Sequence, residues 1–179
     1  LKPATEPKSV LVVGRGPAGM EAARVAALRG HKVTLAEADS ALGGTLRAAA
    51  KAPTRHGIFD ICTWLESEIY RLGVNVRLST YMDADDVTAS DAEAVIVATG
   101  ALPRMDGVQA THPGQPIRNL ARRNVLSSVD LFMQPPADLG RSAVVLDGVG
   151  HYEGLACAEQ LINLGLSVTY VTWLRSFAQ

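Results

Sequence analysis

The sequence has few cysteines. Only Cys62 and Cys157 occur, and they form no C-x-x-C pair. Such pairs carry dithiol redox centres, and four closely spaced cysteines hold iron–sulfur clusters, so both kinds of centre are excluded within these residues. This cysteine usage is typical of reduced cytosolic thiols. Each cysteine lies on an apolar face with helical spacing, and we expect both to be buried in the core.

The sequence also lacks an excess of charge and long apolar runs. Lys and Arg total 17 against 18 Asp and Glu, which gives a net charge of −1. That balance offers no electrostatic basis for binding nucleic acid or an anionic membrane surface. No apolar run approaches the roughly 20 residues of a membrane span. We therefore expect a cytoplasmic protein with no nucleic-acid or membrane partner. The four histidines are scattered without metal-ligand spacing, so no metal site is expected.

A glycine-rich turn follows the first apolar run. Residues 10–13 are all apolar, and residues 14–19 read G-R-G-P-A-G. In this context Gly14 allows a tight turn, Gly16 allows the backbone to approach a diphosphate, and Gly19 lets a helix lie close to the strand. The amides at the start of that helix attract phosphate. The pattern predicts an adenine dinucleotide, or its ADP half, at this turn. The alternative is an ordinary βαβ unit that needs its glycines only to turn.

An acid ends the second apolar strand. Residues 32–36 are predicted as this strand, and Glu37 follows them directly. In dinucleotide-binding folds a carboxylate at this position accepts hydrogen bonds from both ribose hydroxyls. It would also repel a 2′-phosphate. Glu37 is therefore the predicted ribose ligand.

The middle of the chain alternates between helical and strand patterns. Residues 57–72 predict a helix whose buried stripe is Ile58, Ile61, Leu65, Ile69 and Leu72. The other predicted elements are a strand at 74–78, a turn or short helix at 83–91, a strand buried on both faces at 94–98, an irregular connection or small antiparallel strands at 101–124, and a short helix at 127–133.

The opening pattern then returns as a second βαβ unit. A strand at 143–146, a turn at 147–150, a helix at 153–164 and a strand at 168–171 repeat the first unit. Gly148, Gly150 and Gly154 give G-x-G-x-x-x-G, a spacing found in some NADPH sites. No acid follows the last strand, although Arg175 could face a 2′-phosphate. The second unit is thus either a possible NAD(P)H site or a relic of the fold without a ligand.

These elements predict an α/β, Rossmann-like FAD/NAD(P)-binding fold, with a parallel sheet and flanking helices. We expect a linker at 1–8, an FAD/ADP-binding domain at 9–125, and the start of a second, truncated dinucleotide-binding unit at 126–179. The chain begins on a linker without Met and stops soon after a strand, so we expect it to be part of a longer protein.

Three blocks of the sequence together resemble one family of flavoproteins. They are the turn at 10–23, Glu37 with Leu42-Gly43-Gly44, and V-I-V-A-T-G-A-L-P-R at 95–104. The chain resembles the C-terminal portion of the family that includes trimethylamine dehydrogenase, histamine dehydrogenase and 2,4-dienoyl-CoA reductase, the NADH:flavin oxidoreductase type. In that family an N-terminal TIM barrel carries FMN beside an iron–sulfur cluster, and neither is present in these residues.

The resemblance implies FAD, or ADP in some members, bound in the first unit. Arg15 departs from the small residue of most relatives, and we expect its side chain to point to solvent or across the phosphates. Arg47 is expected to reach a phosphate or to form a surface salt bridge. The implied cofactor-binding residues are Gly14, Gly16, Pro17, Ala18, Gly19, Glu37, Ala38, Gly44, Thr45, Leu46, Met82, Ala98, Thr99 and Gly100.

Two functions therefore remain open at the level of sequence. The first is the FAD- or ADP-binding domain of a multidomain flavin-dependent oxidoreductase, which serves electron transfer for a barrel outside this chain. The second is a structural ADP-binding module without a redox role. A free-standing pyridine-nucleotide reductase is a third possibility, and the lack of C-x-x-C excludes its disulfide-reducing branch. No residue is predicted to act as a catalytic acid, base or nucleophile.

Overall fold

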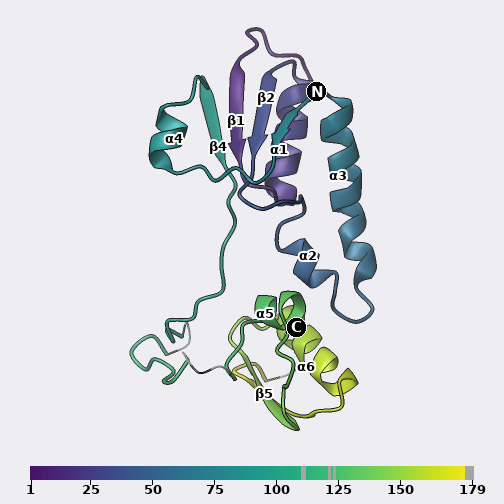
Figure 1. Cartoon of the computed structure of the whole chain (residues 1–179), viewed down its shortest axis with the longest axis vertical. Coiled ribbons are helices and arrows are strands. Elements are labelled where there is room, and N and C mark those ends of the chain that lie inside the picture. The colour runs from purple at the N-terminus through teal and green to yellow at the C-terminus, as the bar shows by residue number, and fades with distance from the viewer. Residues whose placement is uncertain (110–111, 121, 123, 176–179) are drawn as a thin grey trace. The chain divides into compact units, whose positions relative to one another are not determined.

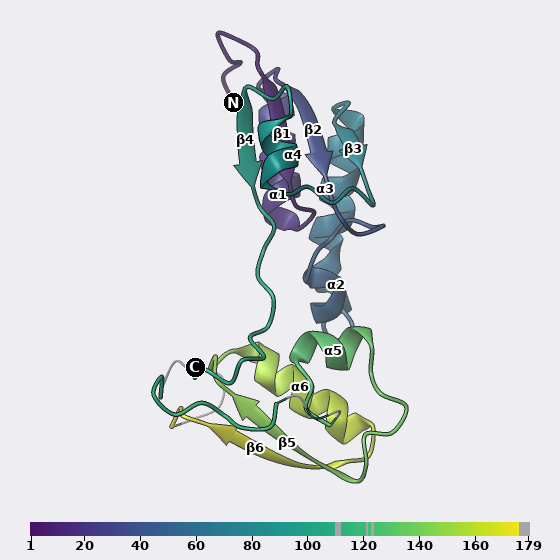
Figure 2. The ribbon, with the colours of Figure 1, turned by 60° about the vertical axis from the view of Figure 1, so that its left-hand side comes forward.

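The computed structural model describes residues 1–109, 112–120, 122 and 124–175, and the chain divides into two compact units. The first unit contains residues 1–47 and 57–101, and the second contains residues 48–56 and 102–179. Figures 1 and 2 show the elements of each unit. Among the residues that the structure describes, no helix combines the length and apolar character that a membrane crossing requires.

The first unit is built on a parallel sheet of order β3-β2-β1-β4. In register, Val12 of β1 lies opposite Leu35 of β2 on one side and Ile96 of β4 on the other. This sheet confirms the predicted α/β fold. Its elements are β1 (Ser9–Val13), α1 (Pro17–Leu28), β2 (Lys32–Ala36), the 3₁₀ helix η1 (His56–Phe59), α3 (Asp60–Arg71), β3 (Asn75–Arg77), α4 (Ala84–Thr88) and β4 (Ala94–Val97).

Alternate side chains of β1 enter two different apolar layers. Val10 and Val12 pack into the main core with residues of α1 and α3, whereas Leu11 and Val13 pack with Met82 and other residues near α4. This alternation follows from the two-residue period of a strand. Helices therefore flank both faces of the sheet (Figure 2). The carboxyl ends of β1, β2 and β4 meet at one edge, where the predicted site residues follow.

The buried stripe of α3 differs from the prediction. Cys62, Leu65 and Ile69 are buried, whereas Ile58 and Ile61 are about half exposed. The helix begins only at Asp60, because the preceding residues form η1. Its buried face therefore runs from Cys62 to Ile69, and the prediction that Ile58 and Ile61 belong to it was wrong. The burial of Cys62 itself agrees with the expectation.

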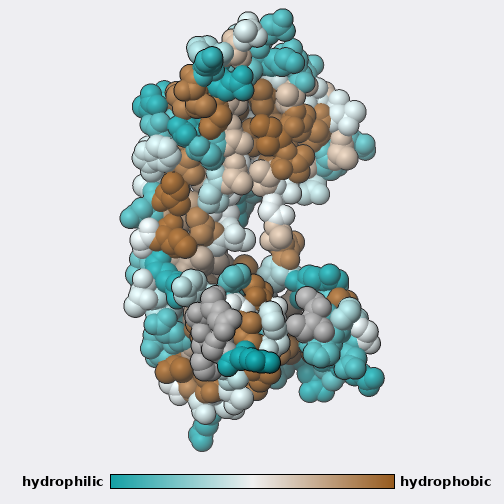
Figure 3. Space-filling model, turned by 180° about the vertical axis from the view of Figure 1, so that it is seen from behind, coloured by the Kyte–Doolittle hydropathy of each residue, from teal (hydrophilic) through white to brown (hydrophobic). Residues whose placement is uncertain are grey.

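Strand β4 is not buried on both faces, contrary to the prediction. Val95, Ile96 and Val97 are exposed, and Val97 has 71% of its surface accessible. The strand is the edge of the described sheet and pairs only with β1. Hydrophobic residues are visible at the surface of this unit in Figure 3. A continuous apolar run does not distinguish a central strand from such an edge.

The second unit contains a parallel pair of strands with one helix packed against it. Its elements are α5 (Ser128–Met133), β5 (Ser142–Asp147), α6 (Tyr152–Asn163) and β6 (Ser167–Thr172), and its core includes Cys157 and Leu161. The described residues of 101–124 form no helix or strand, so the irregular connection was the correct alternative. The boundary between the first unit and residues 48–56 of the second falls within the short helix α2 (Leu46–Ala49).

Candidate nucleotide-binding site

The turn after β1 presents uncapped amides at the start of α1. Gly14 donates its amide to the carbonyl of Ala36 on β2, which fixes the turn at the end of the sheet. Gly16 is the N-cap of α1, Pro17 is its first residue, and no side chain of the described residues caps the helix. Because the first amides of a helix have no partner within it, those of Ala18 and Gly19 are free to bind an anion.

The three glycines of this turn have different surroundings. A Cβ on Gly14 would lie 2.2 Å from the carbonyl oxygen of Ala98, and one on Gly19 would lie 2.1 Å from the carbonyl oxygen of Gly14. A Cβ on Gly16 would meet no atom within 4 Å. Gly14 and Gly19 are therefore required for packing of the polypeptide itself. The space beside Gly16 is open, as a diphosphate requires.

A second turn packs against the first. The amide of Gly43 donates to the carbonyl of Arg15 at 3.0 Å, and a Cβ on Gly44 would lie 2.9 Å from the Cα of Gly16. Gly44 is therefore brought directly beside the predicted diphosphate position. Thr45 is exposed, and Leu46 begins α2.

Glu37 lies at the end of β2, as predicted. Its amide donates to the carbonyl of Arg77, and its carbonyl accepts from the amide of Thr80, so the backbone is fixed on both sides. Its side chain is 12% exposed, and Oε1 accepts from the amide of Asp39 at 2.7 Å. Among the described residues no hydrogen bond reaches Oε2, which is therefore available to a ribose hydroxyl. Ala38 follows in an exposed position.

The segment after β4 contacts the first turn. Ala98 donates its amide to the carbonyl of Val13 at 2.7 Å, and its own carbonyl faces Gly14. Thr99 and Gly100 follow and are exposed. Met82 is partly buried against Leu11, Val13 and Ala36 near the ends of β1 and β2. The structure thus groups the turn, Gly44 and Ala98 by direct contact, and Glu37, Ala38 and Met82 border them.

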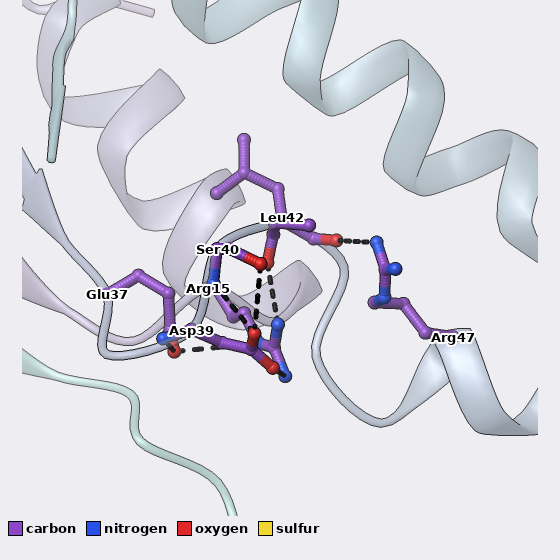
Figure 4. A network of polar contacts seen from close by, with 7 residues as sticks. Arg15, Glu37, Asp39, Ser40, Leu42 and Arg47 are labelled. Carbon is purple, nitrogen blue, oxygen red and sulfur yellow. Dashed lines mark hydrogen bonds and ion pairs between the residues drawn. The ribbon is translucent and has the colours of Figure 1, made fainter. Parts of the chain in front are cut away.

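Arg15 does not point to solvent, which was one of its two expected directions, because its side chain is only 18% exposed and contacts the segment that follows Glu37. Nη2 lies 2.6 Å from a carboxylate oxygen of Asp39, and Nη1 donates to the carbonyl of Ala41 at 2.7 Å (Figure 4). The amide of Ser40 and the Arg15 guanidinium hold the pKa of the Asp39 carboxyl below its usual value, against the opposite effect of burial. Asp39 was not predicted as part of the site, although an acid two residues after Glu37 and an arginine between two glycines were visible in the sequence.

Arg47 forms no surface salt bridge with the described residues, which was one of its two expected contacts, and its contact with a phosphate stays a prediction. Nη1 donates weakly to the carbonyl of Leu42 at 3.4 Å, and within the described residues Arg47 makes no ion pair (Figure 4). No group of three or more His, Cys, Asp or Glu side chains in the described part of the chain could hold a metal ion.

The second glycine turn differs from the first because a carboxylate occupies it. Asp147 is buried, and its Oδ1 accepts from the amides of Val149 and Gly150 at 3.0 and 2.8 Å. Its Oδ2 accepts from the hydroxyls of Tyr170 and Thr172 at 2.9 and 3.2 Å. Those two amides precede α6, whose own first turn, like that of α1, has no side-chain cap among the described residues.

Comparison with known proteins identifies the family. The family model described as pyridine nucleotide-disulphide oxidoreductase matches residues 8–178. The chain therefore belongs to this family, whose Rossmann-like fold agrees with the observed sheet and helices.

Several longer proteins are similar to most of the chain. A multifunctional alkene reductase/demethylase of Caballeronia cordobensis is 40% identical over 93% of the chain and 23% of its own length. The N,N-dimethylglycine/sarcosine dehydrogenase of Chromohalobacter salexigens is 37% identical over 96% of the chain and 24% of its length. The solved structure of histamine dehydrogenase from Rhizobium sp. 4-9 has a TM-score of 0.85 and 33% identity, over 96% of this chain and 25% of that one. The chain spans about a quarter of these relatives, and the resemblance to amine dehydrogenases and related reductases is confirmed.

Proposed function

We propose that this member of the pyridine nucleotide-disulphide oxidoreductase family binds the ADP half of FAD, or ADP itself, in its first unit. The open space beside Gly16 carries the proposal. At Gly14 and Gly19, by contrast, backbone atoms of the protein already occupy the space where a Cβ would lie. Gly16 is also the N-cap of α1, so this open space lies beside the first amides of the helix. The uncapped start of α1 supports the same assignment.

In this proposal each side of the nucleotide has its own contacts. The amides of Ala18 and Gly19 would bind the diphosphate, with Gly14, Gly16 and Pro17 shaping the turn and Gly44, Thr45 and Leu46 closing over it. Glu37 would accept hydrogen bonds from the ribose hydroxyls, Ala38 would line the adenine, and the backbone near Met82 would contact its edge. Ala98, Thr99 and Gly100 would pass near the middle of a dinucleotide. These contacts would bind the ADP half of FAD. The flavin ring would be bound by residues other than these.

The proposal extends to the role of the chain in a longer protein. The relatives whose names describe reductases and dehydrogenases are about four times as long as this chain, by the shares of their length that it covers. We place this chain as the nucleotide-binding part of such a flavin-dependent oxidoreductase, beside an N-terminal barrel with FMN and an iron–sulfur cluster. FAD, when bound, supplies the redox chemistry, and the residues of this chain supply position and electrostatics. NAD(P)H at the second unit is not included in this proposal, because no acid follows β6 to hold a ribose.

Calorimetric titration of the 179-residue chain with ADP and FAD tests this function. Saturable binding of one ADP per chain is expected, and FAD should bind with similar affinity because both share the contacted half. No binding of either nucleotide would overturn the proposal. A structural role for ADP is separated from a redox role by the colour of the longer parent protein, since bound flavin is yellow and bound ADP is colourless.

A further inference from the structure

Arg15 connects the two segments that form the proposed site. Its main-chain carbonyl accepts the amide of Gly43, and its guanidinium donates to the carbonyl of Ala41. Nη2 forms an ion pair with Asp39 at 2.6 Å, and Nε lies 3.6 Å from Oε1 of Glu37. A single residue of the diphosphate turn therefore contacts the ribose-side segment at four points (Figure 4).

These contacts restrict how the Glu37 carboxylate can turn. Oε1 is held between the amide of Asp39 and the guanidinium of Arg15. Asp39 is in turn fixed by its own ion pair with Arg15. With Oε1 fixed in this way, Oε2 has a defined direction. A carboxylate that is oriented in advance loses less freedom when a ribose hydroxyl binds to it.

Arg15 also compensates the charge of two neighbouring carboxylates. Glu37 and Asp39 lie beside a site proposed to receive a diphosphate, which is itself negative. The Arg15 side chain is only 18% exposed, so its attraction to both acids is screened less than at an open surface. Without a cation here, the two carboxylates would repel each other and the ligand.

We propose that Arg15 is a positioning residue for nucleotide recognition, which orients Glu37 toward the ribose and holds the 37–43 segment against the diphosphate turn. This role rests on the proposed binding of ADP in the first unit. Arg15 acts through Glu37 and makes no contact with the ribose. Arg15 is therefore expected to increase the preference for nucleotides that carry both ribose hydroxyls, and not only the affinity for the diphosphate.

The test compares ADP with 2′-deoxy-ADP, which carries the same diphosphate and lacks one ribose hydroxyl. Both affinities are measured by calorimetry for wild type, Arg15→Met and the matched control Arg24→Met. Arg24 forms an ion pair of the same length with Glu21, and its side chain is 17% exposed, but it lies on α1 outside the site. Wild type and Arg24→Met should prefer ADP by about tenfold, the effect of one hydrogen bond to a charged group. In Arg15→Met the preference should fall to about twofold.

Each outcome separates the role of Arg15 from the proposed function. An unchanged preference for ADP over 2′-deoxy-ADP in Arg15→Met would overturn the positioning role. If the preference were unchanged because both affinities fell equally, Arg15 would act on the phosphates. Failure of wild type to bind ADP would overturn the proposed function and this role with it. If Arg15→Met does not fold, Arg15→Lys replaces it. Arg15→Lys keeps the charge but cannot reach three acceptors at once, so the same loss of preference is expected.

Discussion

At the scale of single residues, the three glycines of the first turn occupy two kinds of position, crowded and open. Gly14 and Gly19 lie so close to backbone atoms that an added Cβ would overlap them, whereas Gly16 borders open space. The same sequence motif therefore combines two packing positions with one open position, which we propose is kept small for the diphosphate. This difference makes the turn testable one glycine at a time.

We expect Gly16→Val to abolish ADP binding without unfolding the chain. The added side chain would enter the space that the diphosphate needs, and the backbone of Gly16 has a φ of −67°, which any residue can adopt. Calorimetry measures the binding, and circular dichroism checks the fold. Gly57→Val is the control, because a Cβ there also meets little and lies outside the turn. Normal ADP binding by Gly16→Val would show that the diphosphate does not lie at this residue.

We expect Glu37→Ala to weaken ADP binding by about 1–3 kcal/mol, through the loss of hydrogen bonds between the ribose and a charged acceptor. Glu37→Gln keeps the shape and loses the charge, so its effect should fall between those of wild type and alanine. Glu66→Ala, on the exposed side of α3, serves as the control. Unchanged ADP affinity in Glu37→Ala would disprove the ribose assignment.

Some residues that border the candidate site could be predicted from the sequence, because the backbone geometry there allows only those residue types. Gly14, Gly19 and Gly44 are required by close contacts, and Glu37 follows from its place at the end of a strand. The direction of the Arg15 side chain was not predictable, because a long flexible cation takes its orientation from partners distant in sequence. Its partner Asp39 lies in a segment whose course depends on the second turn.

At the scale of elements, local pattern predicted most helices and strands but not how two of them are buried. The apolar run at 10–13 and the helix at 153–164 were predicted from their own residues, and the structure contains β1 and α6 at these places. The exposure of β4 depends on its edge position in the sheet. The buried face of α3 depends on where η1 ends and the helix starts, which shifts the stripe from Ile61 to Cys62.

The second βαβ unit carries a pH dependence of its own. Burial and the hydrogen bond to Asp147 raise the pKa of Tyr170 to about 12, from an ordinary value of 10.0. A raised folded-state pKa contributes stability that is complete below pH 10 and is lost as the pH rises through about 12. We therefore expect the second unit to lose stability over this range. The fluorescence of Trp173, measured in a Trp64→Phe variant so that only the second unit contributes, follows the urea unfolding of this unit at about pH 9 and about pH 11.5.

Tyr170→Phe is the matched variant for that measurement. Without the hydroxyl, the variant should be less stable at about pH 9 by the loss of one hydrogen bond, about 1 kcal/mol. Its stability should then fall less on going to alkaline pH. An equal alkaline loss in both proteins would assign the titration to a different group.

At the scale of the whole chain, each unit contains a parallel βαβ arrangement, but the glycine turns differ in their contacts. The amide of Gly14 donates to the main-chain carbonyl of Ala36 in the first turn, whereas the amides of Val149 and Gly150 donate to the Asp147 carboxylate in the second. Membership in a pyridine nucleotide-disulphide oxidoreductase family does not require redox thiols in this chain, because both cysteines are buried apart in separate cores.

We expect both thiols to be unreactive in the folded chain. Burial raises the pKa of Cys62, and it raises that of Cys157 from 9.0 to about 11. At about pH 8 this lowers the thiolate fraction of Cys157 about a hundredfold, and alkylation by iodoacetamide should slow at least as much. Mass spectrometry measures the rate, with urea-unfolded chain as the control. Rapid alkylation of folded protein would contradict the core assignment, and so would loss of ADP binding in the Cys62→Ala/Cys157→Ala double variant.

The most direct test of the account is the structure of crystals of this chain soaked with ADP. The diphosphate is expected against the amides of Ala18 and Gly19, beside Gly16, with the ribose hydroxyls on the carboxylate of Glu37. Density for ADP at the turn of the second unit, or none at the first turn at saturating ADP, would contradict the proposal.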